Sequence, residues 1–204
     1  MTTDRTFAEL GVPAPLVRSL TTAGLTHPFP IQVETLPDTL AGRDVLGRGK
    51  TGSGKTLAFA IPLVSRLTEN RRQASRPSGL VLAPTRELAT QITTAIEPLA
   101  AAYGLKVTTI FGGVPQGRQV SALKAGVDIV VACPGRLEDL MRQRLISLDA
   151  VEITVIDEAD HMFDLGFLEP VQRILKETSP GGQKLLFPAT LDQGVASLVD
   201  EFLV

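Results

Sequence analysis

The chain has 204 residues, of which 44% are hydrophobic and 21% charged, and its formal net charge is −2. This size and composition fit one globular domain, and the charge excludes a protein that holds nucleic acid through bulk positive charge. Cys133 is the only cysteine, so a disulfide within the chain and a zinc cluster are both excluded. The first ten residues do not form a signal peptide and no apolar run could span a membrane, so we expect a cytoplasmic domain.

Short apolar segments alternate with longer helical patterns along the chain. In chain order the predicted elements are helices 13–23 and 31–41, strand 44–47, helix 54–68, strand 79–83, helix 86–103, strand 106–111, helix 114–124, strand 128–132, helix 135–142, strand 152–156, helix 167–177, strand 184–187 and helix 193–202. The polar segment 69–79, rich in Arg, Ser and Pro, is predicted to be a surface loop.

The predicted strands are apolar without alternation, as in Leu80-Val81-Leu82-Ala83, so both of their faces should be buried. Strands of this kind that alternate with helices predict an α/β fold, in which a mostly parallel central sheet has helices on both faces. Ligands of such folds bind at the carboxyl ends of the strands.

One glycine-rich segment, 49–56, fits the phosphate-binding pattern G-x-x-x-x-G-K-[ST] between a predicted strand and helix. Its backbone N–H groups and the helix N-terminus would face phosphate oxygens. Lys55 would contact the β and γ phosphates, and Thr56 would offer a hydroxyl to Mg²⁺. The predicted nucleotide contacts in this phosphate loop are Gly49, Lys50, Thr51, Gly52, Ser53, Gly54, Lys55 and Thr56.

A second segment, the acidic loop 157–160, follows the predicted strand 152–156. Asp157 is a candidate Mg²⁺ ligand through the metal's water shell, and Glu158 is a candidate base for the attacking water. With a phosphate loop upstream, Lys55, Asp157 and Glu158 become the predicted catalytic residues.

The acidic loop reads Asp157-Glu158-Ala159-Asp160, and the chain thereby resembles the DEAD-box RNA helicases, which are named after this tetrapeptide. The resemblance extends from Phe7 to about Thr190. It implies that residues 1–204 form a single N-terminal RecA-like ATP-binding domain, with the adenine-reading region in 1–42. The family's second RecA-like domain, which completes the ATPase site, has no candidate in this sequence.

The segment 24–32 resembles the family's adenine-reading Q motif, although Leu25 and Phe29 depart from its commonest pattern. Gln32 carries both a donor and an acceptor, which match N6 and N7 of adenine but not the acceptors of guanine. Phe7 stands where the family keeps an aromatic that backs the adenine pocket. The resemblance thus implies ATP and Mg²⁺ as cofactors.

Three segments between the phosphate loop and the acidic loop resemble the family's RNA-binding motifs, each after a predicted strand. The candidate RNA contacts are Pro84, Thr85, Arg86, Gly112, Gly113, Gln119, Pro134, Gly135 and Arg136. They would grip the phosphates of a single strand. Cys133 replaces a threonine of the family pattern, which weakens one phosphate contact, and no histidine is placed to make it a catalytic thiol.

The coupling segment, Pro188-Ala189-Thr190, stands where the family usually has Ser-Ala-Thr. In that family it links ATP hydrolysis to strand separation, and its serine would bond the acidic loop near Asp160. Proline has no side-chain donor and no N–H. We therefore expect a weakened connection to the acidic loop.

The resemblance implies Mg²⁺-dependent ATP hydrolysis coupled to local RNA strand separation, with single-stranded or duplex RNA and the C-terminal RecA-like domain of the same protein as partners. We expect these 204 residues alone to be monomeric, to bind nucleotide, to hydrolyse it poorly and to contact no membrane. Two alternatives stay open: an ATP-gated RNA clamp or scaffold with impaired coupling, and a P-loop DNA helicase or translocase.

Overall fold

The computed structural model of the protein describes residues 5–68 and 72–204, and residues 69–71 of the predicted surface loop lie outside them. The described residues form a six-stranded sheet in the order β1-β6-β5-β2-β4-β3, with every pair parallel. The strands are β1 Val45–Leu46, β2 Gly79–Leu82, β3 Val107–Ile110, β4 Ile129–Ala132, β5 Ile153–Asp157 and β6 Gln183–Phe187. The predicted α/β fold with a parallel sheet is therefore confirmed.

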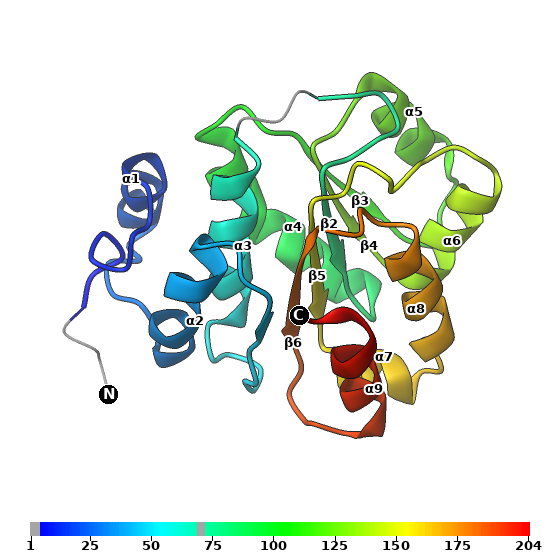
Figure 1. The fold of residues 1–204 in the computed structure, drawn as a ribbon. Helices are drawn as coiled ribbons and strands as arrows, with labels where there is room; N and C mark the ends of the chain where they lie inside the picture. Colours follow the sequence, from blue (N-terminus) through cyan, green and yellow to red (C-terminus); the bar gives the residue numbers. More distant parts are fainter. Residues whose placement is uncertain (1–4, 69–71) are drawn as a thin grey trace.

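Helices cover both faces of the sheet (Figure 1). They are α1 Ala14–Thr22, α2 Pro30–Leu40, α3 Lys55–Arg66, α4 Arg86–Ala101, α5 Gly117–Ala125, α6 Pro134–Arg142, α7 Ala159–Asp164, α8 Leu168–Lys176 and α9 Gln193–Phe202. Helices α1 to α4 share one apolar core and α5 to α9 share the other. No helix in the described ranges is long and apolar enough to cross a membrane.

Each central strand supplies side chains to both cores. Val81 of β2 packs with the α1–α4 layer, whereas Leu80 and Leu82 on either side of it pack with the α5–α9 layer. All residues of β2, β4, β5 and β6 are buried. This explains why their sequences are apolar without alternation, because successive side chains point to opposite faces and both faces are covered.

The carboxyl ends of the strands are level with one another. A single row of paired residues crosses the whole sheet: Leu46, Leu186, Ile156, Leu82, Ala132 and Ile110. Every loop that follows a strand therefore starts from the same edge of the sheet.

Helix α7 was not predicted. The chain leaves β5 through Glu158 in the left-handed region (φ 51°), turns at once into this six-residue helix, and leaves it near Gly166 (φ 83°). A helix this short carries too little periodicity to be separated from a loop in the sequence. The other predicted helices are present, with ends that differ by at most three residues, as in α5, which begins at Gly117 rather than at residue 114.

The core of the α1–α4 layer contains an aromatic pair, Phe59 of α3 and Phe187 of β6, with ring centroids 5.6 Å apart. Both rings are fully buried.

We expect Phe59→Ala to lower the free energy of unfolding by about 3–5 kcal/mol, because it removes buried contacts and leaves a cavity. Urea denaturation measures this loss. The control Leu165→Ala, at a side chain that is 49% exposed, should cost less than about 0.5 kcal/mol. A loss below about 1 kcal/mol for Phe59→Ala would contradict this packing.

Candidate functional site

The loops that carry the predicted motifs leave one edge of the sheet in two groups. The phosphate loop follows β1, the coupling segment follows β6 and the acidic loop follows β5, and these three strands are neighbours. The segments at 84–86, 133–136 and 112–113 follow β2, β4 and β3, which are neighbours in the other half of the sheet. The strand order thus divides the edge into two halves that meet between β5 and β2.

The phosphate loop is attached to the strand next to it. The N–H of Gly47 donates to the Leu186 carbonyl at 2.8 Å, and the N–H of Gly49 donates to the Pro188 carbonyl at 3.1 Å. The loop then curls, with Gly54 at φ 89°, and α3 begins at Lys55. A Cβ on Gly54 would lie 2.6 Å from Gln32 Nε2, so only glycine fits both the backbone conformation and the space.

Two polar atoms of the phosphate loop are buried without a hydrogen-bond partner among the described residues: Lys55 Nζ and Ser53 Oγ. The nearest acidic oxygen to Lys55 Nζ is Asp157 Oδ1 at 3.7 Å, which is too far for a hydrogen bond. A buried ammonium group without hydrogen bonds is costly. Phosphate oxygens supply the missing acceptors and the negative charge, so these residues fit the phosphates of a nucleotide.

The carboxyl group of Asp157 is almost completely buried at the end of β5. Burial raises the pKa of Asp157 to about 6, the charge of Lys55 partly opposes this rise, and Glu158 adds to it. Asp157 is therefore mostly ionised at pH 7. Within residues 5–68 and 72–204, no three Asp, Glu, His or Cys side chains lie close enough to hold a metal by themselves. A cation at Asp157 would therefore need further oxygen ligands, such as a hydroxyl group, phosphate oxygens or water.

The acidic loop and the coupling segment are joined through Asp160. Its carboxylate accepts hydrogen bonds from the Ala189 N–H at 3.2 Å, the Thr190 N–H at 2.8 Å and the Thr190 hydroxyl at 2.8 Å. The coupling segment is therefore bonded to the acidic loop through Ala189 and Thr190, whereas Pro188 has no side-chain donor and no N–H to add to these bonds. Burial acts to raise the pKa of Asp160, but the hydrogen bonds from Thr190 and Ala189 outweigh it and hold this pKa below its usual value.

Gln32 lies beside the phosphate loop and is fully buried. Its Oε1 accepts from the Phe29 N–H at the start of α2, and its Nε2 donates to the Gly54 carbonyl, both at 2.9 Å. This amide therefore bridges the segment 24–32 and the phosphate loop. Phe7 is buried in the same apolar core as Ile31 of α2, whereas the Phe29 side chain is 51% exposed.

In the other half of the edge, Arg86 at the start of α4 connects two loops. Its guanidinium lies 5.0 Å from the ring centroid of Phe111, in a cation–π contact. Gly113 has φ 75°, which favours glycine, and a Cβ there would lie 2.9 Å from Arg86 Nη1, so a larger residue would displace the guanidinium. Thr85 caps α4 by accepting from the Leu88 N–H. No feature of the sequence predicts the contact of Phe111 with Arg86.

Arg136 and Gln119 hold the double-glycine loop 112–113 from the other side. Arg136 donates to the Val114 carbonyl at 3.0 Å and to Gln119 Oε1 at 3.4 Å, while Gln119 Nε2 donates to the Phe111 carbonyl at 2.9 Å. Gly112 and Gly135 face open space. The predicted RNA contacts thus lie in the loops that follow β2, β4 and β3 and in the first turns of the helices α4, α5 and α6.

Cys133 is half-buried before α6. Burial, together with the nearby Glu87, raises the pKa of this thiol to about 11 although Arg86 acts to lower it. The thiol is therefore neutral at pH 7, the form in which cysteine is a poor nucleophile.

Comparison with known proteins gives a consistent result. The family model described as "DEAD/DEAH box helicase" matches residues 29–198. The chain is 41% identical to ATP-dependent RNA helicase RhlB of Sodalis glossinidius, over 98% of this chain and 50% of that protein. It is 42% identical to DEAD-box ATP-dependent RNA helicase 5 of Arabidopsis thaliana, over 98% of this chain and 38% of that protein. The chain thus spans half or less of these curated relatives.

Solved structures show the same fold. A DEAD box protein from Methanococcus jannaschii superposes with a TM-score of 0.90 at 34% identity, covering 97% of this chain and 53% of that one. The RNA helicase Prp28 from Chaetomium thermophilum, solved bound to ADP, superposes with a TM-score of 0.91 at 37% identity, covering 98% of this chain and 49% of that one.

The hydrogen bonds to the Asp160 carboxylate predict that the free energy of unfolding depends on pH in the acidic range. We expect Thr190→Val to raise the pKa of Asp160 and to lower the free energy of unfolding at pH 7 by about 1 kcal/mol, because it removes one hydrogen bond to a carboxylate. The stabilisation is present above the ordinary aspartate pKa of 3.8 and is lost as the pH falls through the lower pKa of the folded state. The stability difference between variant and parent should therefore shrink towards pH 3.

Urea unfolding at several pH values and an NMR titration of the Asp160 carboxyl carbon measure the two effects. Thr190→Ser keeps the hydroxyl and is the matched control, with little change expected in either quantity. An unchanged pKa of Asp160 in Thr190→Val would show that the hydroxyl does not bind this carboxylate.

Proposed function

The chain belongs to the DEAD/DEAH box helicase family, and from this we propose that it is the N-terminal ATP-binding RecA-like domain of an ATP-dependent RNA helicase. The observation that carries the proposal is the pair of buried atoms without a hydrogen-bond partner among the described residues, Lys55 Nζ and Ser53 Oγ, of which Lys55 Nζ lies 3.7 Å from Asp157 Oδ1. A site built this way is incomplete until an anion with several acceptor oxygens enters it. The triphosphate of ATP is such an anion.

The phosphate loop, residues 49–56, would hold the triphosphate with its N–H groups and with Lys55. Thr56 and Asp157, whose carboxylate is buried, would hold Mg²⁺ together with phosphate oxygens and water. Mg²⁺, when bound, neutralises charge on the phosphates. Glu158, whose side chain is 22% exposed, would orient the attacking water and accept its proton.

The adenine would lie near Gln32, with Phe7 supporting the apolar wall behind it. In the structure both ends of the Gln32 amide are engaged with Phe29 and Gly54. A primary amide has two N–H donors and an oxygen with two lone pairs, so one donor and one acceptor remain for a base. Adenine matches that pair and guanine does not. The same residue would thus join base recognition to the phosphate loop.

The β2-β4-β3 half of the edge would bind the sugar-phosphate backbone of RNA with little sequence preference. Arg86 and Arg136 keep unused guanidinium N–H groups, and the double-glycine loop that they hold leaves backbone free for a close approach. The proposed contacts are Pro84, Thr85, Arg86, Gly112, Gly113, Gln119, Pro134, Gly135 and Arg136. A second RecA-like domain of the full-length protein would close over this edge and complete both sites.

The contacts of Asp160 bear on the alternatives. An RNA clamp with impaired coupling would be favoured if Pro188 separated the coupling segment from the acidic loop. Three hydrogen bonds still join these segments through Ala189 and Thr190, which favours the helicase. Competition between RNA and DNA for the full-length protein separates this proposal from a DNA translocase.

Base selectivity tests the proposal directly. We expect the chain to bind ADP at least about tenfold more tightly than GDP, because a well-placed pair of hydrogen bonds discriminates by about 1–3 kcal/mol. In Gln32→Ala this ratio should fall towards one. Isothermal titration calorimetry of both nucleotides with both proteins measures it.

The ratio of the affinities for ADP and GDP distinguishes a loss of base recognition from a general loss of structure. Gln32→Ala also removes the bond to Gly54, so a loss of affinity shared equally by ADP and GDP would indicate a structural role alone. Gln143→Ala, which removes only exposed hydrogen bonds to Gln116 and Asp139, is the control. Equal affinity of the unmodified chain for the two nucleotides would refute the adenine assignment.

Catalysis should need more than these 204 residues. An arginine finger is worth about 10³–10⁵ in rate, and we assign that group to the second domain. We expect phosphate release from ATP by the chain alone to be slower than that of the full-length protein by about this factor, and single-stranded RNA should not stimulate it. The full-length Glu158→Gln variant gives the background rate. RNA-stimulated turnover of the chain at the full-length rate would contradict the assignment.

A further inference from the structure

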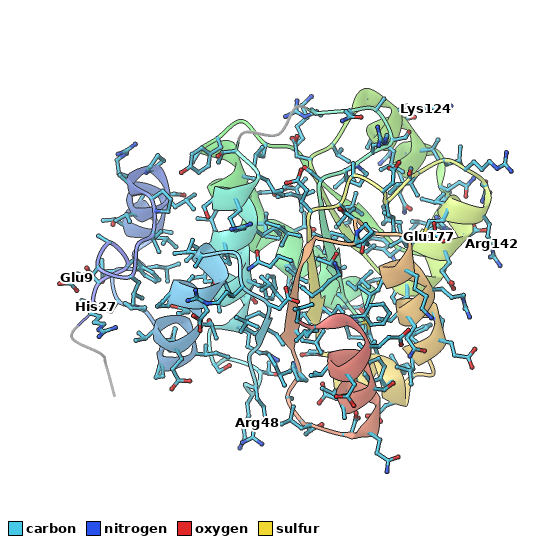
Figure 2. All side chains as sticks on the ribbon, in the orientation of Figure 1. Glu9, His27, Arg48, Lys124, Arg142 and Glu177 are labelled. Atoms are coloured by element: carbon cyan, nitrogen blue, oxygen red, sulfur yellow. The ribbon has the colours of Figure 1, made fainter. Side chains whose placement is uncertain are left out.

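A cavity of about 800 Å³ lies at the end of the sheet opposite the phosphate loop. It is lined by the segments that enter β2 and β5, at Ser75 and Leu148, and by side chains of α6 and α8. Figure 2 shows Arg142, at the end of α6, projecting from the side of the molecule remote from Arg48, which precedes the phosphate loop. A molecule in this cavity would leave the nucleotide and RNA edge uncovered.

The cavity has an apolar floor and a charged rim. Ile146 and Leu148 are buried beneath it, and Met141 of α6 is half-buried beside them. Five basic side chains and two acidic ones line it: Arg76, Arg142, Arg144, Arg173 and Lys176, with Glu138 and Glu177. The local charge is therefore opposite in sign to the net charge of the chain.

Ion pairs divide the basic residues into two kinds. Arg76 forms two hydrogen bonds with Asp149, Arg173 forms two with Glu138, and Lys176 pairs with Glu201 at 3.0 Å. These three side chains are therefore engaged in ion pairs within the domain.

Arg142 and Arg144 are available for a ligand. Arg142 approaches Asp139 only to 3.5 Å, and its side chain is 78% exposed, so this pair contributes little. Arg144 is exposed and forms no side-chain hydrogen bond or ion pair with any residue in 5–68 or 72–204. Two cations thus stand at the rim above an apolar floor.

Arg144 also has an unusual backbone. Its φ is 59°, and it follows the last turn of α6, where the N–H of Leu145 returns to the Leu140 carbonyl. Glycine is the preferred residue in this position. The chain here carries an arginine in a backbone conformation that lowers its stability, although no described residue bonds to the side chain.

We propose that this cavity is a docking site for an acidic peptide segment of a partner protein, one that places a large apolar side chain against the half-buried Met141 and a carboxylate on Arg142 and Arg144. An arginine guanidinium can donate two parallel N–H hydrogen bonds to one carboxylate. The volume of the cavity falls in the range of ligand sites, about 300–1,000 Å³.

The rim of the cavity is exposed. A peptide that lies across the rim therefore fits this site better than a small molecule that would be enclosed. The apolar floor and the two glutamates disfavour RNA. The inference stands independently of the proposed helicase function.

A selection experiment tests the docking site. Random dodecapeptides displayed on phage are selected against the chain, and the recovered peptides are synthesised with a fluorescent label. We expect peptides that combine Asp or Glu with Phe, Leu or Trp. Fluorescence anisotropy should show that Arg142→Glu/Arg144→Glu weakens their binding by about tenfold or more. The control Arg118→Glu/Lys124→Glu makes the same charge change on α5 and should leave binding unchanged.

A second variant separates binding from folding. Arg144→Gly removes the cation and places the residue preferred for φ 59°, so its melting temperature should equal or exceed that of the parent while peptide binding falls several-fold. Recovery of no acidic peptides, equal binding by the charge-reversed variant, or binding of single-stranded RNA that Arg142→Glu/Arg144→Glu abolishes would each overturn the proposal.

Discussion

The parallel, level arrangement of the six strands is the constraint on which the candidate site depends. One row of paired residues, from Leu46 to Ile110, runs across the whole sheet, and the residues that follow it begin the functional loops. Asp157 comes one position after this row, and Pro84, Gly112 and Pro134 come two positions after it. Residues more than a hundred positions apart in the sequence are brought to one edge because the strands end together. A shift of one strand along its neighbours would separate its loop from the others.

The strand order adds a second level of organisation. The chain does not lay its strands down in sequence order: β6 lies between β1 and β5, and β4 lies between β2 and β3. The coupling segment after β6 is therefore adjacent to both the phosphate loop and the acidic loop, and it is bonded to each, through the Pro188 carbonyl and through Thr190. The candidate RNA loops are linked to one another by Arg86 and Arg136. Each half of the edge is thus a connected unit.

Much of this could be predicted from the sequence, and the exceptions have physical reasons. Long apolar or amphipathic segments identified the strands and most helices, and fixed spacings identified the phosphate loop and the acidic loop. Helix α7 was missed because six residues show no clear period. The contact of Arg86 with Phe111 and the burial of Gln32 were missed because they depend on how distant loops meet. The sequence shows which donor is lost at Pro188, but not that Ala189 and Thr190 reach Asp160, because that contact depends on how two distant loops meet.

The burial of Gln32 has a kinetic consequence. Its side chain is fully buried and bonded to Phe29 and Gly54, so an adenine that binds there, as we propose, would reach the amide only after this region opens. The observed association rate of an adenine nucleotide is then scaled by the fraction of molecules that are open. At high nucleotide concentration the rate should level off at the opening rate instead of rising without limit. Nucleotide exchange in this domain would then be timed by a local opening of the protein rather than by diffusion.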